Sequence, residues 1–321
     1  MRQAGRYLPE YRKLKSKYGF LEIVKNPDLS AEATLQPMRR FGFDCAIIFS
    51  DILVVAEALG FPYEFKDGGG IIMRRKIGGM RDIEAIDTDC NIVREKLAYV
   101  AKSLSILRRE LPDKALLGFC ASAFTLAAYM VEGCSSTNFP SYSKFINEYP
   151  AEFRLLTQKL SKVLGEYAKM QAECGIDGFQ IFDSHATLAP LGRYEELSAV
   201  HISEIVSQIP SDIPSILFAK GMSARFGELL KSNAKVYSLD SESKLSEIFN
   251  KFRGKFALQG NLDQNMLATG NPASVRQKTL DVIADMNGTR SHILNLGHGI
   301  TPDAKLENVE AFCQTAREFQ P

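Results

Sequence analysis

Two arginines near the amino terminus have the type and spacing needed to bind carboxylates. Arg2 and Arg6 bracket the tripeptide Gln-Ala-Gly at residues 3–5. Gly5 permits a tight turn or a close approach of the backbone to a ligand. A guanidinium group can hold a carboxylate through two parallel hydrogen bonds. We therefore expect Arg2 and Arg6 to bind an anionic ligand.

Further polar side chains occur where short apolar segments end. These residues are Asp51, Asp183, Ser184, Lys220, Asp240, Asp263 and His298. From the residues alone, Asp51 is either a carboxylate of the site or a helix cap, because aspartate at a strand-to-helix turn often caps the helix that follows. Lys220 and Lys76 are weaker candidates for additional carboxylate contacts. The adjacent Ser184 and His185 do not indicate a hydrolase, since neighbouring residues on a strand point to opposite faces and no GxSxG motif is present.

The elements that must position these residues alternate along the chain. Short apolar segments rich in β-forming residues lie at 45–51, 115–120, 178–184, 215–221, 235–240, 255–262 and 292–299. Helical spacing predicts helices at 94–111, 151–174, 195–208, 223–232, 243–252, 274–286 and 305–317. Continuous apolar segments alternating with helices are typical of parallel strands buried on both faces.

This alternation permits an open doubly wound sheet or a closed barrel. The chain holds seven predicted strands, and an eighth would fit immediately before Arg2. We therefore predict an α/β fold, a (β/α)8 TIM-type barrel whose first strand is largely missing from this numbering. Residues 1–321 are expected to form one barrel domain, with a β-hairpin excursion at about 61–82. The glycines there do not indicate a P-loop, because no GK[ST] follows.

Composition limits the classes of partner. The chain has 39 basic and 38 acidic side chains, which argues against a nucleic-acid binder, so any positive site must be local. Six cysteines without a CxxC pair indicate buried free thiols in a reducing compartment. No apolar segment is long enough to cross a membrane. We expect a cytoplasmic protein with no nucleic-acid or membrane partner.

Several motifs together resemble one enzyme family. The segment MRQAGRYLPEYR (1–12) resembles the first signature of the uroporphyrinogen decarboxylases. The matching blocks that follow, in the family's order, are FSDILVVAEALG (49–60), FTLAAYMVEG (124–133), FDSHA (182–186), LQGNLD (258–263) and NLGHG (295–299). The resemblance spans nearly the whole chain. It implies a homodimeric (β/α)8 enzyme of haem biosynthesis that removes four acetate carboxyl groups from uroporphyrinogen III, giving coproporphyrinogen III without metal or organic cofactor.

The resemblance also assigns roles to single residues. Asp51 matches the acid that faces the four pyrrole N–H groups, and Arg2 and Arg6 match the loop that meets substrate carboxylates. The matched residues expected to contact substrate are Gln3, Tyr129, Phe182, Ser184 and His298. A fixed anion such as Asp51 would stabilise a protonated, cationic pyrrole while carbon dioxide departs. The proton donor is left open between His298 and a carboxylate paired with Arg2.

The sequence departs from the family in places. The family usually carries additional residues before the first signature, including most of the first barrel strand, so we expect the functional protein to start upstream. Phe124 replaces a usual tryptophan, and Gln264 replaces the usual proline after GNLD. These changes affect local geometry.

Two other functions fit parts of the pattern. The first is a related barrel methyltransferase that binds zinc, but no histidine here has a cysteine two positions on. The second is an inactive tetrapyrrole carrier, which would bind porphyrinogen and release no carbon dioxide. The joint presence of Arg2, Arg6 and Asp51 argues against the carrier.

Overall fold

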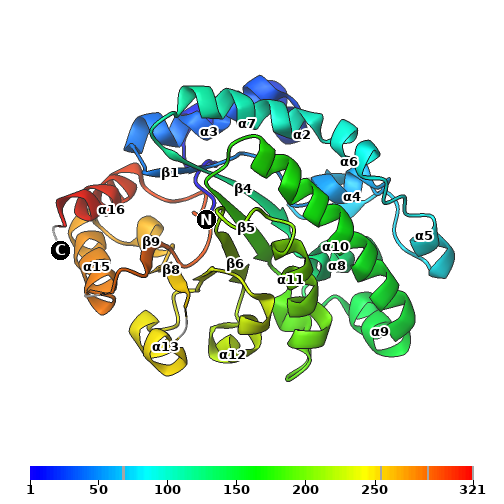
Figure 1. Cartoon of the computed structure of the whole chain (residues 1–321). Helices are drawn as coiled ribbons and strands as arrows, with labels where there is room; N and C mark the ends of the chain where they lie inside the picture. Colours follow the sequence, from blue (N-terminus) through cyan, green and yellow to red (C-terminus); the bar gives the residue numbers. More distant parts are fainter. Residues whose placement is uncertain (67–68, 254, 288, 320–321) are drawn as a thin grey trace.

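A parallel β-sheet forms the centre of the molecule (Figure 1). The computed structural model describes residues 1–66, 69–253, 255–287 and 289–319. Within these residues the sheet has the order β1-β4-β5-β6-β7-β8-β9, and every neighbouring pair is parallel. Its strands are β1 (Cys45–Ile47), β4 (Ala115–Ala121), β5 (Gly178–Asp183), β6 (Ser215–Ala219), β7 (Val236–Ser238), β8 (Ala257–Leu262) and β9 (His292–Leu296). All seven strands predicted from the apolar segments are confirmed.

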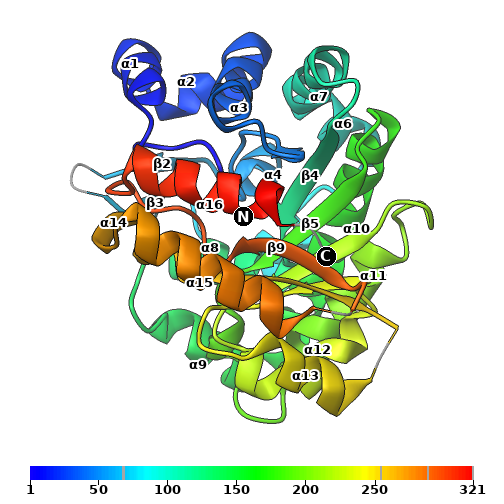
Figure 2. The ribbon, with the colours of Figure 1, turned by 90° about the vertical axis from the view of Figure 1, so that its left-hand side faces the viewer.

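Helices surround the sheet (Figures 1 and 2). They are α1 (Pro9–Tyr18), α2 (Phe20–Lys25), α3 (Pro27–Phe41), α4 (Val54–Ala58), α5 (Met80–Glu84), α6 (Cys90–Lys96), α7 (Ala98–Glu110), α8 (Ala123–Glu132), α9 (Pro140–Glu148), α10 (Pro150–Glu173), α11 (Val200–Val206), α12 (Phe226–Leu229), α13 (Leu245–Phe252), α14 (Met266–Thr269), α15 (Pro272–Asp285) and α16 (Leu306–Glu318). The strands follow one another across the sheet in sequence order, without the reversal of order that marks a doubly wound sheet, which places the chain in the TIM-type barrel class.

Three predicted helices differ in detail from the structure. The helix expected at 94–111 is interrupted at Leu97, where α6 ends and α7 begins. The helix expected at 195–208 opens with a π-helical turn at Glu195–Ala199. The segment expected at 223–232 holds only the short α12 between two 3₁₀ turns. Apolar spacing predicts that a helix forms, but the π-helical and 3₁₀ turns depend on what the helix packs against.

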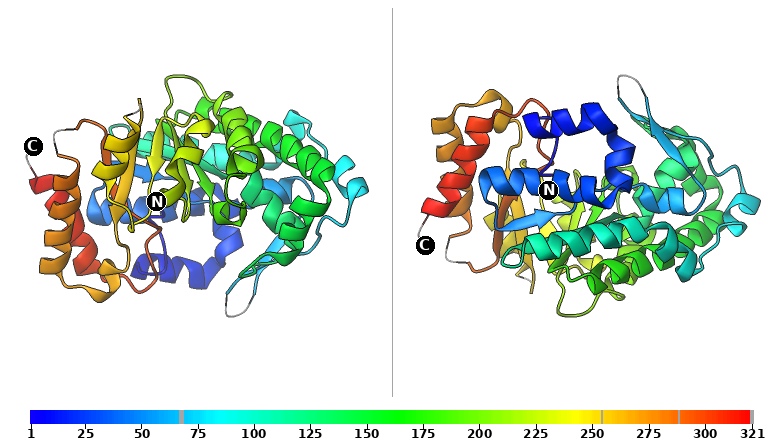
Figure 3. Two further views of the ribbon diagram at one scale, coloured as in Figure 1. Left: turned by 90° about the horizontal axis from the view of Figure 1, so that it is seen from below. Right: turned by 90° about the horizontal axis from the view of Figure 1, so that it is seen from above.

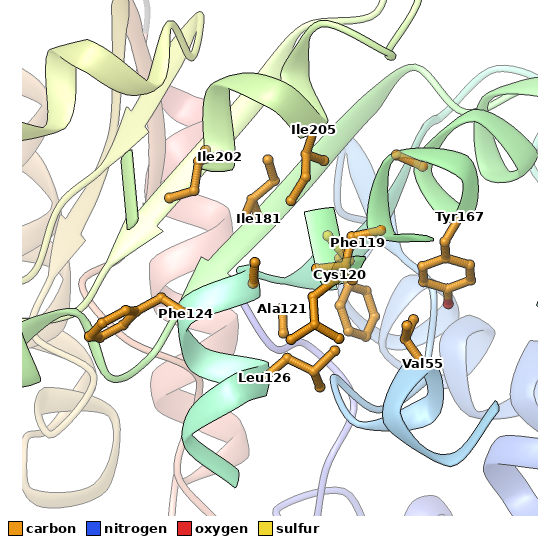
Figure 4. Close-up of a cluster of buried hydrophobic side chains, with 14 of the residues drawn as sticks. Val55, Phe119, Cys120, Ala121, Phe124, Leu126, Tyr167, Ile181, Ile202 and Ile205 are labelled. Atoms are coloured by element: carbon orange, nitrogen blue, oxygen red, sulfur yellow. The ribbon is translucent and has the colours of Figure 1, made fainter. Parts of the chain in front are cut away.

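The core joins the strands to the outer helices. In Figure 4, Ile181 of β5 points toward Ile202 and Ile205 of α11, and all three side chains are fully buried.

A pair of hydrogen bonds from one buried side chain, which we call a polar clamp, also fixes α10 against β4. The Gln171 carboxamide donates to Phe119 O at 3.0 Å and accepts from Phe119 N–H at 3.0 Å. A clamp of this kind satisfies buried polar groups that would otherwise cost free energy.

A β-hairpin follows α4 and projects from the body of the molecule (Figure 3). Its strands β2 (Tyr63–Phe65) and β3 (Ile71–Met73) pair in antiparallel fashion. The end of the hairpin is tied to α8, because Met73 N–H donates to Gly133 O and Ile77 N–H donates to Met130 O, both at 2.8 Å. The hairpin therefore lies beside the helix that carries Tyr129.

The amino-terminal residues lie between the two edge strands of the sheet. The Gln3 carboxamide donates to Cys45 O at 2.7 Å and accepts from Ile47 N–H at 3.0 Å, so it pairs with the free edge of β1. On the other side, Ile300 N–H, just past β9, donates to Arg2 O at 3.5 Å. The two edges of the curled sheet therefore flank residues 2 and 3.

Candidate active site

The candidate side chains gather at one rim of the sheet. Asp51 follows β1, Ser184 follows β5, Lys220 follows β6, Asp240 follows β7 and His298 follows β9. Because all seven strands are parallel, their carboxyl ends meet at the same edge. This is the end at which TIM-type barrels carry their active sites.

Arg2 connects the two sides of the gap between β1 and β9. A Cβ added to Gly299 would lie 3.0 Å from the Arg2 Cβ, so the arginine packs directly on the loop that carries His298. The positive charge of Arg2 lowers the pKa of both Asp51 and His298. The structure thus brings together Arg2, Asp51 and His298. Arg6 is exposed, and its charge and that of Arg2 both act on Tyr11.

Asp51 is a partly buried carboxylate rather than a helix cap. Its Oδ1 accepts the Leu53 N–H at 2.8 Å, but the helix α4 begins at Val54 with Leu53 as its N-cap. Burial raises the pKa of Asp51, while the Leu53 N–H, the Tyr63 hydroxyl and the Arg2 charge oppose that shift. Because burial has removed part of its hydration, this carboxylate would be stabilised by a cation or by N–H donors that bind to it.

Gln3 uses both ends of its side-chain amide on the backbone of β1. That placement fixes the loop between Arg2 and Arg6 relative to Asp51. A contact between Gln3 and substrate remains a prediction.

Tyr129 and His185 form an aromatic wall beside Asp51. Tyr129 on α8 is buried, and burial together with the Asp51 charge raises its pKa. Its ring meets the His185 ring edge-on at 5.0 Å, and His185 lies 4.3 Å from the Phe139 ring. Burial lowers the pKa of His185 to about 4, so the imidazole is neutral at physiological pH. Its Nε2 is buried without a hydrogen-bond partner among the described residues.

His185 was not among the predicted site residues, and the prediction that Ser184 and His185 point to opposite faces of a strand was wrong. β5 ends at Asp183, so Ser184 and His185 lie in a turn rather than on a strand. The signal that could have identified His185 was its place in the FDSHA block, next to two predicted site residues.

Phe182 belongs to a row of aromatic rings across the sheet. Its ring lies 5.6 Å from that of Phe119 on β4 and 6.3 Å from that of Phe218 on β6. Phe218 in turn meets the His298 ring at 6.0 Å. These edge-to-face contacts give the rim an apolar floor that links Phe182 to His298.

Asp183 has a structural environment that the sequence did not reveal. Its carboxylate is fully buried and accepts four hydroxyl groups. The donors are Ser122 (2.8 Å), Thr125 (2.7 Å), Tyr194 (2.9 Å) and Ser198 (2.6 Å). These bonds tie β5 to α8 and to the π-helical turn. Thr125 Oγ1 also accepts the His185 N–H at 3.1 Å, which holds the turn that carries Ser184 and His185.

His298 is neutral at physiological pH. Burial lowers its pKa, and the charges of Lys220 and Arg2 lower it further, against the opposing effects of Gly299 O and Asp240. Only a minor fraction of this imidazole is protonated near pH 7, where an ordinary histidine is already mostly neutral. His298 is therefore better suited to exchange hydrogen bonds than to carry a positive charge.

Comparison with known proteins decides the family. The family described as "Uroporphyrinogen decarboxylase (URO-D)" matches residues 1–319. The chain belongs to the uroporphyrinogen decarboxylase family. A uroporphyrinogen decarboxylase of Ruthia magnifica subsp. Calyptogena magnifica is 36% identical, covering 99% of this chain and 93% of the relative. A uroporphyrinogen decarboxylase of Legionella pneumophila (strain Lens) is 37% identical, covering 100% and 92%.

Solved structures place the same fold in other enzymes. A methyltransferase from Methanosarcina mazei superposes with a TM-score of 0.79 at 18% identity, covering 96% of this chain and 90% of the neighbour. A B12-independent methionine synthase from Shewanella sp. W3-18-1 gives a TM-score of 0.60 at 12% identity, covering 94% and 89%. Likeness at this identity shows that this member of the uroporphyrinogen decarboxylase family shares their barrel architecture.

Nowhere in the described residues of this family member do three or more His, Cys, Asp or Glu side chains gather as a possible metal site. None of the helices in these residues combines the length and the apolar character that a membrane span requires.

Proposed function

We propose that the chain is a uroporphyrinogen decarboxylase that converts uroporphyrinogen III to coproporphyrinogen III in tetrapyrrole biosynthesis. It would remove the four acetate carboxyl groups without a metal or organic cofactor. The observation that carries the proposal is the placement of Asp51, after β1, and Arg2, between β1 and the loop after β9, in a chain of this family.

Arg2 and Arg6 would bind the carboxylate arms of the substrate. Both residues are exposed to the solvent. A guanidinium group gives geometric specificity as well as charge when it binds a carboxylate through two hydrogen bonds. Tyr129 and Ser184 would line the walls and Phe182 the floor, with Gln3 holding the arginine loop in place.

Asp51 would stabilise the cationic ring on which the reaction depends. A proton added to a ring carbon makes the pyrrole cationic, and the bond from the methylene to the carboxylate then breaks. Its electron pair neutralises the ring and carbon dioxide leaves. The methylene carbon next takes up a proton to become a methyl group, and the ring carbon gives one back. In balance, one proton replaces each carbon dioxide.

The size of this effect is adequate for catalysis. Two opposite charges about 4 Å apart at an effective dielectric of about 20 attract each other by roughly 4 kcal/mol. If that attraction exists only when the ring is cationic, it accelerates the reaction by about a thousandfold. The raised pKa of Asp51 adds to this benefit, because a poorly solvated carboxylate gains most from a new positive partner.

The lowered pKa of His298 bears on the choice of proton donor. A mostly neutral imidazole supplies few protons at neutral pH, and a carboxyl group that Arg2 holds would supply fewer still, because the guanidinium charge lowers its pKa. Both groups therefore stay in the proposal as proton donors, and His298 would also donate a hydrogen bond to substrate.

We further propose that residues 1–321 form one domain, that two such chains form a homodimer, and that the enzyme is cytoplasmic.

The test is anaerobic incubation of the purified protein with uroporphyrinogen III, followed by oxidation and separation of the products by number of carboxyl groups. We expect products with seven to four carboxyl groups and release of carbon dioxide. Binding of the porphyrinogen without any loss of carboxyl groups would identify a carrier instead. Absence of both binding and turnover would refute the proposal.

A further inference from the structure

Lys220 occupies the centre of the sheet's rim. It directly follows β6, and its N–H donates to Asp183 O at 3.2 Å. In the sheet order, β1, β4 and β5 lie on one side of β6 and β7, β8 and β9 on the other. Arg2 lies in the gap between β1 and β9, the two edges of the curled sheet. Lys220 is therefore three strands from that gap in either direction, on the opposite side of the rim from Arg2.

The His298 loop lies between the two cations, because the Phe218 ring, two residues before Lys220, meets the His298 ring at 6.0 Å and Gly299 packs against Arg2. The positive charges of Lys220 and Arg2 both act on His298. Lys220 also acts on His185, which forms the wall beside Tyr129. The lysine thus faces the same space as the residues already placed in the candidate active site.

The charge of Lys220 is not neutralised within the described residues. The side chain is exposed, and the ion pairs found there involve other lysines, such as Lys231 with Glu195 and Lys244 with Asp285. Asp240, at the end of the neighbouring strand, uses its carboxylate on hydrogen bonds rather than on an ion pair with Lys220. It accepts the Gly221 N–H at 3.0 Å and the Ser223 hydroxyl at 2.9 Å.

We propose that Lys220 is a substrate-binding residue that holds a carboxylate arm of the porphyrinogen on the side opposite Arg2. This inference rests on the proposed function. Uroporphyrinogen carries carboxylates around its whole periphery, and the arginine loop reaches only one side of the rim. An ammonium group is a compact charge with three donors on a flexible stem, which suits a mobile acetate or propionate arm.

The experiment compares Lys220→Gln with wild type in two independent measurements. One is steady-state decarboxylation of uroporphyrinogen III, and the other is the dissociation constant of uroporphyrin III, a stable oxidised analogue, from fluorescence quenching. We expect KM and Kd to rise about tenfold, as for one lost charge-assisted hydrogen bond. Turnover at saturation should change by less than about twofold, because Lys220 binds an arm remote from the reacting carbon.

The matched control makes the same lysine-to-glutamine change at a position away from the rim. Lys235 is exposed and directly precedes β7, at the opposite end of the barrel. Lys235→Gln should leave KM and Kd unchanged. Lys220→Arg should recover most of the affinity, because it restores the positive charge.

Titration with coproporphyrin III, which keeps only the propionate arms, identifies the arm. Weaker binding of both porphyrins by Lys220→Gln assigns a propionate, and weaker binding of uroporphyrin alone assigns an acetate. Equal Kd values for Lys220→Gln and wild type overturn the inference, whether or not wild type shows turnover. Failure of wild type to decarboxylate, with uroporphyrin still bound more weakly by Lys220→Gln, overturns the proposed function and supports the lysine subsite.

Discussion

Burial of Asp51 costs stability in the resting protein. Its pKa is raised above the ordinary value of 3.8, and burial is the main cause. Between the ordinary and the raised pKa, the folded chain holds a proton that the unfolded chain has lost. The free energy of unfolding therefore falls as pH rises through this window, and the full cost is present at neutral pH.

Asp51→Asn should separate activity from stability. The asparagine Oδ1 can still accept the Leu53 N–H, so the local turn survives. The loss of the anion should lower kcat by about a thousandfold, since the cationic ring loses its partner. Urea unfolding at pH 7 should show a stability equal to or above that of wild type, because no charge is buried. The stability difference should shrink as the pH is lowered through the raised pKa.

The control for this prediction is an acid of the same type outside the site. Asp113 is exposed in the turn before β4, and Asp113→Asn should change neither kcat nor the unfolding midpoint. If Asp51→Asn kept more than about a tenth of wild-type kcat, the charge-stabilisation mechanism would be wrong.

At the scale of elements, two glycines let the loop after β9 approach its neighbours. A Cβ at Gly297 would lie 2.5 Å from Ser241 N, and one at Gly299 would lie 3.0 Å from Arg2 Cβ. The first contact joins the loop to the backbone after β7, and the second joins it to the arginine loop. The loop after β9 can therefore lie this close to the segment after β7 and to the arginine loop only because Gly297 and Gly299 have no side chain.

Gly299→Ala should displace Arg2 while leaving the fold intact. The new methyl group would lie 3.0 Å from the Arg2 Cβ, so Arg2 must move by a few tenths of an ångström, and we expect little change in the unfolding midpoint. A shift of Arg2 by a few tenths of an ångström to one ångström should lower kcat/KM by up to about a hundredfold, because the carboxylate is held in the wrong place. Steady-state kinetics with uroporphyrinogen measures the effect.

The matched control is Gly79→Ala, whose Cβ would have no neighbour within 4 Å. It should leave kcat/KM at the wild-type value. A Gly299→Ala enzyme with normal KM and kcat would show that the close approach does not position Arg2.

The sequence predicted the strands better than the contacts between elements. Seven apolar segments sufficed for the strands, because a strand buried on both faces requires them. The break at Leu97, the π-helical turn and the Gln3 pairing with β1 depend on neighbours distant in sequence. Asp183 looked like one more acid at a strand end, and only the fold shows the four hydroxyl groups that surround it. Local sequence carries no signal for such contacts.

At the scale of the whole molecule, two hydrophobic clusters hold the chain together. The larger one contains residues from Val24 to Met286 and follows the sheet. The smaller one joins the two ends of the chain, packing Tyr7 and Phe41 against Val309 and Cys313. Arg317 on α16 also donates a hydrogen bond to Phe41 O. The smaller cluster therefore supports the arginine loop from outside the gap between β1 and β9.

The proposal that residues 1–321 form one domain predicts that the two clusters unfold together. Val309 lies in the smaller cluster and Leu160 in the larger, and both are at most 1% exposed. Val309→Ala should lower the free energy of unfolding by about 2 kcal/mol and Leu160→Ala by about 3 kcal/mol. Unfolding can be followed by far-UV circular dichroism and by tyrosine fluorescence, since the chain has 11 Tyr and no Trp. In each variant, the two signals should show the same decrease in the urea midpoint. If Val309→Ala instead produced a separate unfolding transition at lower urea concentration, the smaller cluster would be an independent unit. The arginine loop would then open without loss of the sheet, and activity would disappear at lower urea concentration than the circular dichroism signal.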